Sequence, residues 1–140
     1  MNNSIVHLIP NNIYGGVECA AKTTEGMNSK KFSFEVFYLN EYQNGEPKNI
    51  LKTLVNYYKS LILLINKKPD YLIVSLWKSC LFALIFRLFR RKSKLILFLH
   101  ASKNFHFFDF IFNYLVLICS YQIWVDSKNT FVERLKTFPL

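Results

Sequence analysis

Apolar residues along this chain follow two alternating patterns. Short runs rich in β-branched and aromatic residues, bounded by turn-forming residues, predict β-strands. Between them lie longer segments whose apolar residues recur at steps of three and four, as on one face of an α-helix. The predicted strands are residues 4–9, 32–38, 71–75, 94–99 and 121–126. The predicted helices are residues 17–28, 48–68, 77–91, 107–119 and 128–136, the last with Ser127 as its N-cap.

The regular alternation of strands and helices predicts an α/β fold. Helical crossovers between successive strands favour parallel pairing, and the continuous apolar strands at 71–75 and 95–99 suit a sheet that is covered on both faces. The expected architecture is a Rossmann-like open parallel sheet with helices on both faces. Because 140 residues provide one sizeable core, residues 1–140 are expected to form a single domain.

The spacing also predicts which side of two helices faces the sheet. In the segment that begins at Lys48, the expected inward residues are Ile50, Leu54, Tyr57, Tyr58, Leu61, Leu64 and Ile65. In residues 77–91 they are Leu81, Leu84, Ile85 and Leu88. Residues 40–47 are polar and rich in turn formers, and are expected to be a connection.

Composition adds a strongly basic character. The chain has 18 Lys and Arg against 9 Asp and Glu, a formal net charge of +9. Such a surplus attracts anionic lipid, phosphate-bearing substrates or nucleic acid, although nucleotide bias in the genome can also produce it. No nucleic-acid-binding module is recognisable, so nucleic acid is not an expected partner. The 17% of aromatic residues exceeds what a core needs, and some are expected to meet a partner or a membrane.

Cysteines and apolar segments bear on the cellular compartment. Cys19, Cys80 and Cys119 are odd in number and widely spaced, which argues against a disulfide framework or a zinc site and fits a reducing compartment. The first residues lack the pattern of a signal peptide. Residues 71–89 and 107–125 contain charged or polar residues that disfavour a membrane span. The expected location is cytoplasmic, with peripheral contact to the inner face of the membrane as a further hypothesis.

Ligands of open α/β sheets bind at the carboxyl ends of the strands. This rule selects the loops at 10–16, 75–77, 100–106 and 126–127. Gly15-Gly16 before a helix could present backbone N–H groups to a phosphate, or could simply form a flexible turn. His100 could bond a substrate hydroxyl and Lys103 a phosphate, while a solvated loop histidine is the alternative. Neither a dinucleotide fingerprint, a P-loop, a nucleophile elbow nor a zinc-protease motif occurs.

The other candidates also have common structural explanations. His7 suits a satisfied structural residue inside a strand, and His106 a loop residue. Trp77 could stack on a sugar or belong to the core. Glu18 and Glu25 are expected to be solvated. The basic cluster is either a solvated helix end or a contact with anionic headgroups; its residues are Arg87, Arg90, Arg91, Lys92 and Lys94.

An ordered series of segments resembles the N-terminal half of a GT-B-fold, family-4-type glycosyltransferase. Residues 5–9 followed by Gly15-Gly16-Val17-Glu18 resemble its first strand and GGVE loop. Residues 68–75 resemble its PDIIHVH strand, residues 95–100 its VVLTLHG strand, and residues 123–127 its IVAVS strand. The series runs from Ile5 to about Leu135. It departs from the family at Ala101, where the family has Gly, and at the second histidine of HVH, which Leu76 or Trp77 replaces.

The resemblance implies sugar transfer from a nucleotide-diphosphate sugar to a glycan acceptor, commonly lipid-linked, as in bacterial surface polysaccharide biosynthesis (lipopolysaccharide or capsule). It implies that Gly15 and Gly16 approach the donor diphosphate and that His100, the catalytic candidate, contacts the transferred sugar. The residues expected to contact the acceptor or the sugar are Trp77, Ser102, Lys103 and Ser127. Neither a metal nor a cofactor is expected, because stabilisation of the leaving diphosphate would be the main catalytic contribution.

The family's nucleotide-sugar motif, E-x7-E, lies in a second Rossmann domain, which residues 1–140 do not contain. These residues are therefore expected to be inactive alone. The alternative is a small basic membrane-associating or interaction protein without catalysis, whose membrane-surface residues would be Arg87, Arg90, Arg91 and Lys92. Neither the sugar, the acceptor nor an oligomeric state is indicated by the sequence.

Overall fold

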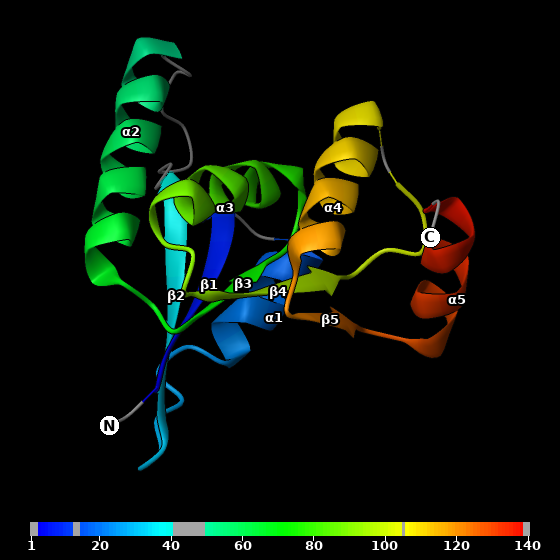
Figure 1. Cartoon of the computed structure of the whole chain (residues 1–140), viewed down its shortest axis with the longest axis horizontal. Coiled ribbons are helices and arrows are strands. Elements are labelled where there is room, and N and C mark those ends of the chain that lie inside the picture. The colour runs from blue at the N-terminus through cyan, green and yellow to red at the C-terminus, as the bar shows by residue number, and fades with distance from the viewer. Residues whose placement is uncertain (1–2, 13–14, 41–49, 105, 139–140) are drawn as a thin grey trace.

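Five strands of the chain pair into one parallel sheet in the order β2-β1-β3-β4-β5 (Figure 1). The computed structural model describes residues 3–12, 15–40, 50–104 and 106–138. Its strands are β1 (Asn3–Asn11), β2 (Phe32–Asn40), β3 (Tyr71–Val74), β4 (Lys94–Leu99) and β5 (Gln122–Val125). Its helices are α1 (Gly16–Thr23), α2 (Ile50–Lys67), α3 (Trp77–Phe89), α4 (Phe107–Cys119) and α5 (Lys128–Thr137).

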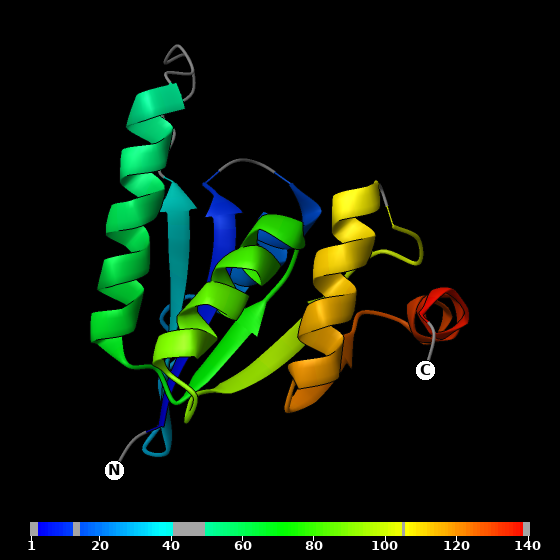
Figure 2. The ribbon, with the colours of Figure 1, turned by 45° about the horizontal axis from the view of Figure 1, so that its top comes forward.

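Helices cover both faces of this sheet. α2, α3 and α4 lie side by side on one face, α1 lies on the other, and α5 lies beyond the β5 edge (Figures 1 and 2). The chain moves from β1 to one edge through α1, then returns to β3 and continues to the other edge. Right-handed crossovers that run in opposite directions place their helices on opposite faces. The predicted Rossmann-like α/β fold is therefore confirmed.

Two cores of different size hold these layers together. The larger lies between the sheet and α2, α3 and α4, and includes Val6, Leu72, Leu97, Phe86 and Val116. The smaller lies under α1 and consists of Ile9, Ala21 and Val36 with partly buried neighbours. Alternate residues of each strand point to opposite faces, so the side chains that accompany Ile9 on its face include His7.

Most predicted bounds lie close to those of the structure, with differences at turns. The first helix ends at Thr23 and not at Asn28, because Gly26 adopts a positive φ of 75° in the turn that follows. β1 extends through Pro10, and Asn40 belongs to β2. Residues 41–49, which contain the rest of the predicted connection, lie outside the described residues. The predicted cap is confirmed, since the Ser127 hydroxyl accepts a hydrogen bond from the Thr130 N–H.

The predicted inward face of α3 is confirmed only at Leu84, which packs against the larger core. The helix buries Ser79, Cys80, Ala83 and Phe86, whereas Leu88 is 70% exposed. α3 is apolar on almost every side, so spacing alone does not select a face, and three small residues allow the helix to lie close to the sheet. In α2, Leu64 is buried as predicted, with Tyr57, Leu61 and Ile65 packed beside the core, but Ile50, Leu54 and Tyr58 are exposed.

The polar residues that interrupt α4 point into the protein. Asp109 and Asn113 are both buried, one turn apart, and the Asn113 amide donates a hydrogen bond of 2.9 Å to the Asp109 carboxylate. Among the described residues, no helix combines the length and apolarity that a membrane crossing requires.

Candidate functional site

A cavity of about 440 Å³ opens at the carboxyl edge of the sheet. Its walls come from the start of α1, the end of β4 and the loop after it, and the facing sides of α4 and α5. Leu76, His100 and Asp126 line it from the loops that follow β3, β4 and β5, and Gly16 lines it as the first residue of α1. This is the edge at which open α/β sheets bind ligands.

Beside the cavity, three side chains form a hydrogen-bonded row across neighbouring strands. His7 Nε2 lies 3.0 Å from the Ser75 hydroxyl, and the same hydroxyl lies 3.3 Å from His100 Nε2. β1 lies next to β3 and β3 next to β4 in the sheet, so the row follows the strand order. His7 and Ser75 are buried, whereas His100 is partly exposed and borders the cavity.

Both imidazoles are held in the neutral form. Burial, with a smaller contribution from His100, lowers the pKa of His7 to about 4. Burial also lowers the pKa of His100, and the nearby Asp126 carboxylate partly offsets this effect. At neutral pH the row therefore offers uncharged hydrogen-bonding groups, which suit a hydroxyl more than an anion.

The backbone turns sharply after Ser75. Leu76 has φ 70° and ψ 148°, a conformation that residues with a side chain rarely adopt and that costs of order 1–3 kcal/mol. It is the N-cap residue of α3, and its side chain lines the cavity. This strained residue lies between β3 and α3, directly after Ser75, whose hydroxyl contacts the two histidines.

A second buried network forms the opposite wall. The Asp109 and Arg134 side chains are each 4% exposed, and the two charged groups lie 3.6 Å apart. The Arg134 Nε–H donates to the Ala101 carbonyl oxygen at 2.7 Å, and a further N–H donates to Asn104 Oδ1. Arg134 thereby attaches α5 to the loop that follows His100. Burial lowers the pKa of Arg134, and Asp109 counteracts this shift.

The N-terminus of α1 has an acidic neighbour. Glu18 is 6% exposed, so its predicted solvation is wrong, whereas Glu25 is exposed. The Glu18 side chain folds back over the first turn, and a Cβ atom at Gly15 would collide with its carboxylate. A carboxylate is stabilised at this position by the positive end of the helix. A Cβ atom at Gly16 would meet no atom of the described residues within 4 Å, and Gly16 borders the cavity.

Four further residues were expected to contact an acceptor or a sugar, and none is among the described residues that line the cavity. The Trp77 ring stacks on Phe108 and Phe112 at centroid distances of 5.7 and 6.1 Å. Ser127 caps α5. Ser102 is half-buried, and Lys103 is exposed on the loop after β4.

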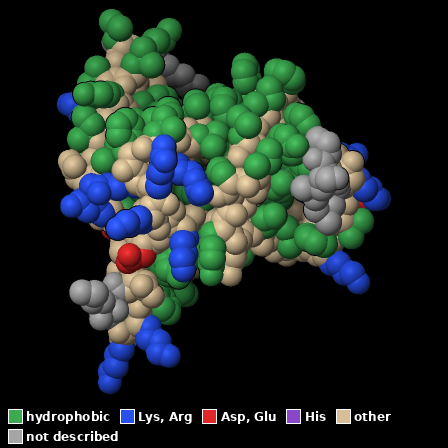
Figure 3. Space-filling view, viewed as in Figure 1, with side chains coloured by type: hydrophobic (Ala, Val, Ile, Leu, Met, Phe, Trp, Pro, Cys, Tyr) green, Lys and Arg blue, Asp and Glu red, His purple; other side chains and the backbone are tan. Residues whose placement is uncertain are grey.

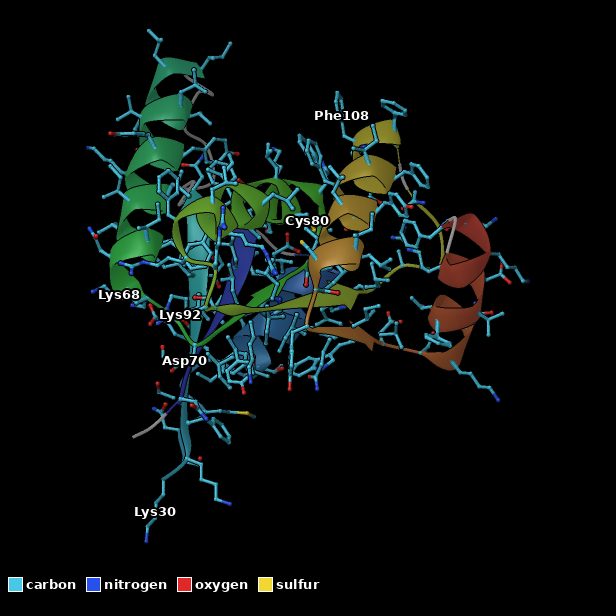
Figure 4. The ribbon with its side chains drawn as sticks, viewed as in Figure 1. Lys30, Lys68, Asp70, Cys80, Lys92 and Phe108 are labelled. Atoms are coloured by element: carbon cyan, nitrogen blue, oxygen red, sulfur yellow. The ribbon has the colours of Figure 1, made fainter. Side chains whose placement is uncertain are left out.

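The basic cluster lies at the opposite, amino edge of the sheet, where Figure 4 shows Lys68 and Lys92. Two of its arginines connect neighbouring helices by hydrogen bonds. Arg87 donates to the Cys119 carbonyl oxygen at 2.7 Å and Arg90 to the Ile65 carbonyl oxygen at 3.0 Å, so each satisfies the end of a neighbouring helix. Arg91 and Lys92 are exposed.

The helix layer above this cluster carries an extensive apolar surface (Figure 3). Its exposed large side chains lie on all three helices; they are Ile50, Leu51, Leu54, Val55, Tyr58, Ile62 and Leu63 on α2, Leu88 and Phe89 on α3, and Phe107, Phe108, Leu115 and Ile118 on α4. A groove of about 480 Å³ runs between α3 and α4, with apolar walls and with Arg87 and Arg91 at its border. Below, this surface with Arg91 and Lys92 is called the helix-layer surface.

Comparison with known protein families, curated proteins and solved structures finds no match to this chain. Its own residues therefore carry the functional argument. Within the described residues, no group of three His, Cys, Asp or Glu side chains could hold a metal ion. Cys19, Cys80 and Cys119 are free thiols.

Several residues of the site were not singled out from the sequence. Ser75 marked the end of a strand, but nothing in the sequence indicated that it would join His7 to His100. Asp109 and Asn113 had a detectable signal, because two polar residues four apart in an apolar helix share one face. Arg134 had no such signal, since it lies among other charged residues of a polar helix.

Proposed function

We propose that this chain is the acceptor-side domain of a glycosyltransferase that uses a nucleotide-diphosphate sugar. The carrying observation is the cavity at the carboxyl edge, bordered by Gly16 and His100. These residues belong to two segments of the series that resembles family-4-type glycosyltransferases. The acceptor would be a glycan, lipid-linked where synthesis takes place at a membrane surface.

The proposed roles follow from the chemistry of each group. The neutral His100 imidazole would bond a hydroxyl of the transferred sugar, which orients the sugar without competing for the diphosphate. Gly16 would allow the ligand close to the α1 backbone, because no Cβ atom stands there. The donor's nucleotide would rest mainly on a second domain, as the family resemblance implies. Binding to residues 1–140 alone is therefore expected to be weak, and transfer is not expected from them.

The experiment is a titration of the labelled chain followed by backbone NMR. The probes are UDP-glucose, UDP-N-acetylglucosamine and GDP-mannose, with UMP for comparison. At least one sugar nucleotide is expected to shift the signals of Gly16, His100 and Ala101 more than UMP does. His100→Ala should reduce the response, whereas Lys30→Ala, far from the cavity, should retain it.

Two results would overturn this proposal. One is the absence of any change at the cavity with all three sugar nucleotides. The other is strong, saturable binding there of a ligand unrelated to sugars or nucleotides.

The alternative function, association with a membrane without catalysis, is favoured by the helix-layer surface. Exposed apolar side chains beside Arg91 and Lys92 match a bilayer whose headgroups are anionic. Peripheral membrane contact is also compatible with the glycosyltransferase proposal, since lipid-linked acceptors lie at the membrane. The NMR titration, and not membrane binding, therefore separates the two functions.

Membrane contact is tested by flotation with vesicles of phosphatidylcholine alone or mixed with phosphatidylglycerol. The chain is expected to float with the anionic vesicles and to be released by salt. Arg91→Glu/Lys92→Glu should weaken binding by about tenfold or more, since each basic residue near the surface contributes about 1 kcal/mol. Lys30→Glu/Lys31→Glu makes the same change in net charge elsewhere and is the matched control. Equal losses in both variants would contradict docking through the helix-layer surface.

A further inference from the structure

The row formed by His7, Ser75 and His100 has an unusual composition, since one hydroxyl serves two imidazoles. Ser75 is fully buried and has a single proton, and its hydroxyl bonds the two rings. Accepting from both rings would leave that proton without an acceptor, so Ser75 is expected to donate to one ring and accept from the other. The two histidines are therefore coupled. If Ser75 donates to His100, then His7 Nε2 carries a proton; if Ser75 donates to His7, then His100 Nε2 carries one.

Packing holds the members of the row in place. The His7 ring lies between Phe34 and Phe98, at centroid distances of 6.5 and 6.2 Å. The Phe98 ring also lies 3.8 Å from the His100 ring. Ser75 is fully buried, and the strained Leu76 follows it. These contacts leave little freedom for any of the three side chains to turn away.

The row determines what His100 can offer to a ligand. Its Nε2 is used by Ser75, which leaves Nδ1 as the ring nitrogen for other contacts. With the Nε2 proton fixed, Nδ1 is an acceptor; with the Nε2 lone pair engaged, Nδ1 carries a proton and is a donor. The direction of the hydrogen bonds is thus transmitted from the buried His7 to the cavity.

We propose that Ser75 and His7 are positioning residues, which hold His100 in one neutral tautomer and one ring orientation so that its Nδ1 meets a ligand hydroxyl. That the bound group is a hydroxyl rests on the proposed function, whereas the fixed tautomer of His100 is a property of the chain itself. Asp126, which directly follows β5, and Asp109 on α4 line the same cavity as His100. The Asp126 carboxylate affects the pKa of His100.

Nitrogen NMR of the imidazole rings tests this inference directly. The full chain contains three histidines, so each signal of a histidine-labelled sample is assigned by one substitution. In the wild type, His100 is expected to show one dominant tautomer, by a factor of about ten, which corresponds to roughly 1.4 kcal/mol. Ser75→Ala should return His100 to a mixture of tautomers. Ser75→Thr, which keeps the hydroxyl, should preserve the dominant tautomer.

His106 is the internal control, because its Nδ1 accepts a hydrogen bond from the Asp109 N–H and it lies outside the row. Its signals should not change in Ser75→Ala. Should Ser75→Thr fail to fold because of its extra methyl group, His7→Gln offers a second test, since an amide there can still bond Ser75. That variant should also preserve one dominant His100 tautomer.

A His100 tautomer ratio that is the same in the wild type and in folded Ser75→Ala would overturn the inference, as would a mixture in the wild type. A ligand titration separates this outcome from failure of the proposed function. If the tautomer is fixed but UDP-glucose leaves His100 unaffected, the row stands and the glycosyltransferase proposal is weakened. If UDP-glucose binds Ser75→Ala as it binds the wild type, positioning for the ligand is wrong although the proposed function stands.

Discussion

His7 is an imidazole buried inside a sheet, and its charged form is therefore unfavourable in the folded state. Its pKa of about 4 lies below the value of 6.5 that it has when exposed. Between these values the unfolded chain binds a proton that the folded chain does not, so stability falls as the pH decreases through this window. The loss of stability caused by His7 is small above pH 6.5, grows as the pH falls, and is complete below about pH 4.

This shift predicts that His7 alone lowers the free energy of unfolding by about 2 kcal/mol between pH 7 and pH 5. The measurement is urea unfolding of the wild type and of His7→Gln at both values. The difference between the two pH values should be smaller in the variant by about this amount. His106→Gln removes an exposed imidazole and is the comparison. A variant with the wild-type difference would show that His7 is not held neutral.

A second prediction concerns the buried ion pair of Asp109 and Arg134. Arg134→Met removes the cation and leaves a carboxylate buried without its charge partner, which is expected to cost about 3–5 kcal/mol. Asp109→Asn/Arg134→Met should recover part of this loss, because no unpaired charge remains. Both values follow from urea unfolding at neutral pH.

The matched control uses an exposed pair in the same helix. Lys136 lies 2.7 Å from Glu133 on the surface of α5, and Lys136→Met should cost much less than Arg134→Met, because water screens an exposed pair. Similar losses in Arg134→Met and Lys136→Met would mean that the network around Arg134 does not hold α5 to the rest of the domain.

At the scale of elements, the end of α2 gives a prediction with opposite signs at two neighbouring positions. Lys68 has φ 53°, in the left-handed region where glycine is favoured. Lys68→Gly is therefore expected to stabilise the fold by about 1 kcal/mol. Lys67 is the last residue of the helix and pairs with Glu35 at 2.7 Å. Lys67→Gly should destabilise by about 1 kcal/mol, and thermal unfolding distinguishes the two signs.

The elements also show what the sequence could and could not predict. Their order, type and approximate bounds followed from spacing and turn residues, since these signals are local. The face of α3 did not, because a helix that is apolar on most sides offers no contrast, and the choice depended on how closely small residues let it approach the sheet. α1 was predicted too long because the turn at Gly26 depends on one glycine's conformation.

The candidate site likewise has a part that the sequence predicted and a part that it did not. The carboxyl-edge rule selected the loops of Gly16, Leu76, His100 and Asp126, because strand ends follow from local patterns and parallel pairing. The side chains that join them depend on register. His7 and Ser75 are 68 residues apart in the chain, and only pairing of β1 with β3 brings them together. Arg134 likewise required the packing of α5.

At the scale of the whole molecule, the two surfaces for which we propose functions differ in place and character. The cavity lies at the carboxyl edge of the sheet, whereas Lys92 lies at the amino edge, below the helix layer (Figure 4). Contact of the helix layer with a membrane would leave the face covered by α1 in water. The orientation of a bound molecule is therefore a measurable consequence of the fold.

The two tryptophans report this orientation, because they lie on opposite faces. Trp77 stacks on Phe108 in the helix layer, and Phe108 lies in the first turn of α4 and projects outward (Figure 4). Trp124 lies on the α1 face against Phe98 and is 42% exposed. If the helix layer meets the bilayer, brominated lipid in anionic vesicles should quench Trp77 more strongly than Trp124.

The measurement uses Trp124→Phe, which retains Trp77, and Trp77→Phe, which retains Trp124. Without vesicles, the order should be reversed for a quencher dissolved in water, because Trp124 is the more exposed ring. This reversal distinguishes contact with lipid from general accessibility. Equal or stronger lipid quenching of Trp124 would instead place the membrane against the α1 face, the face from which Gly16, Val17 and Ala20 line the cavity. That result would contradict docking through the helix-layer surface.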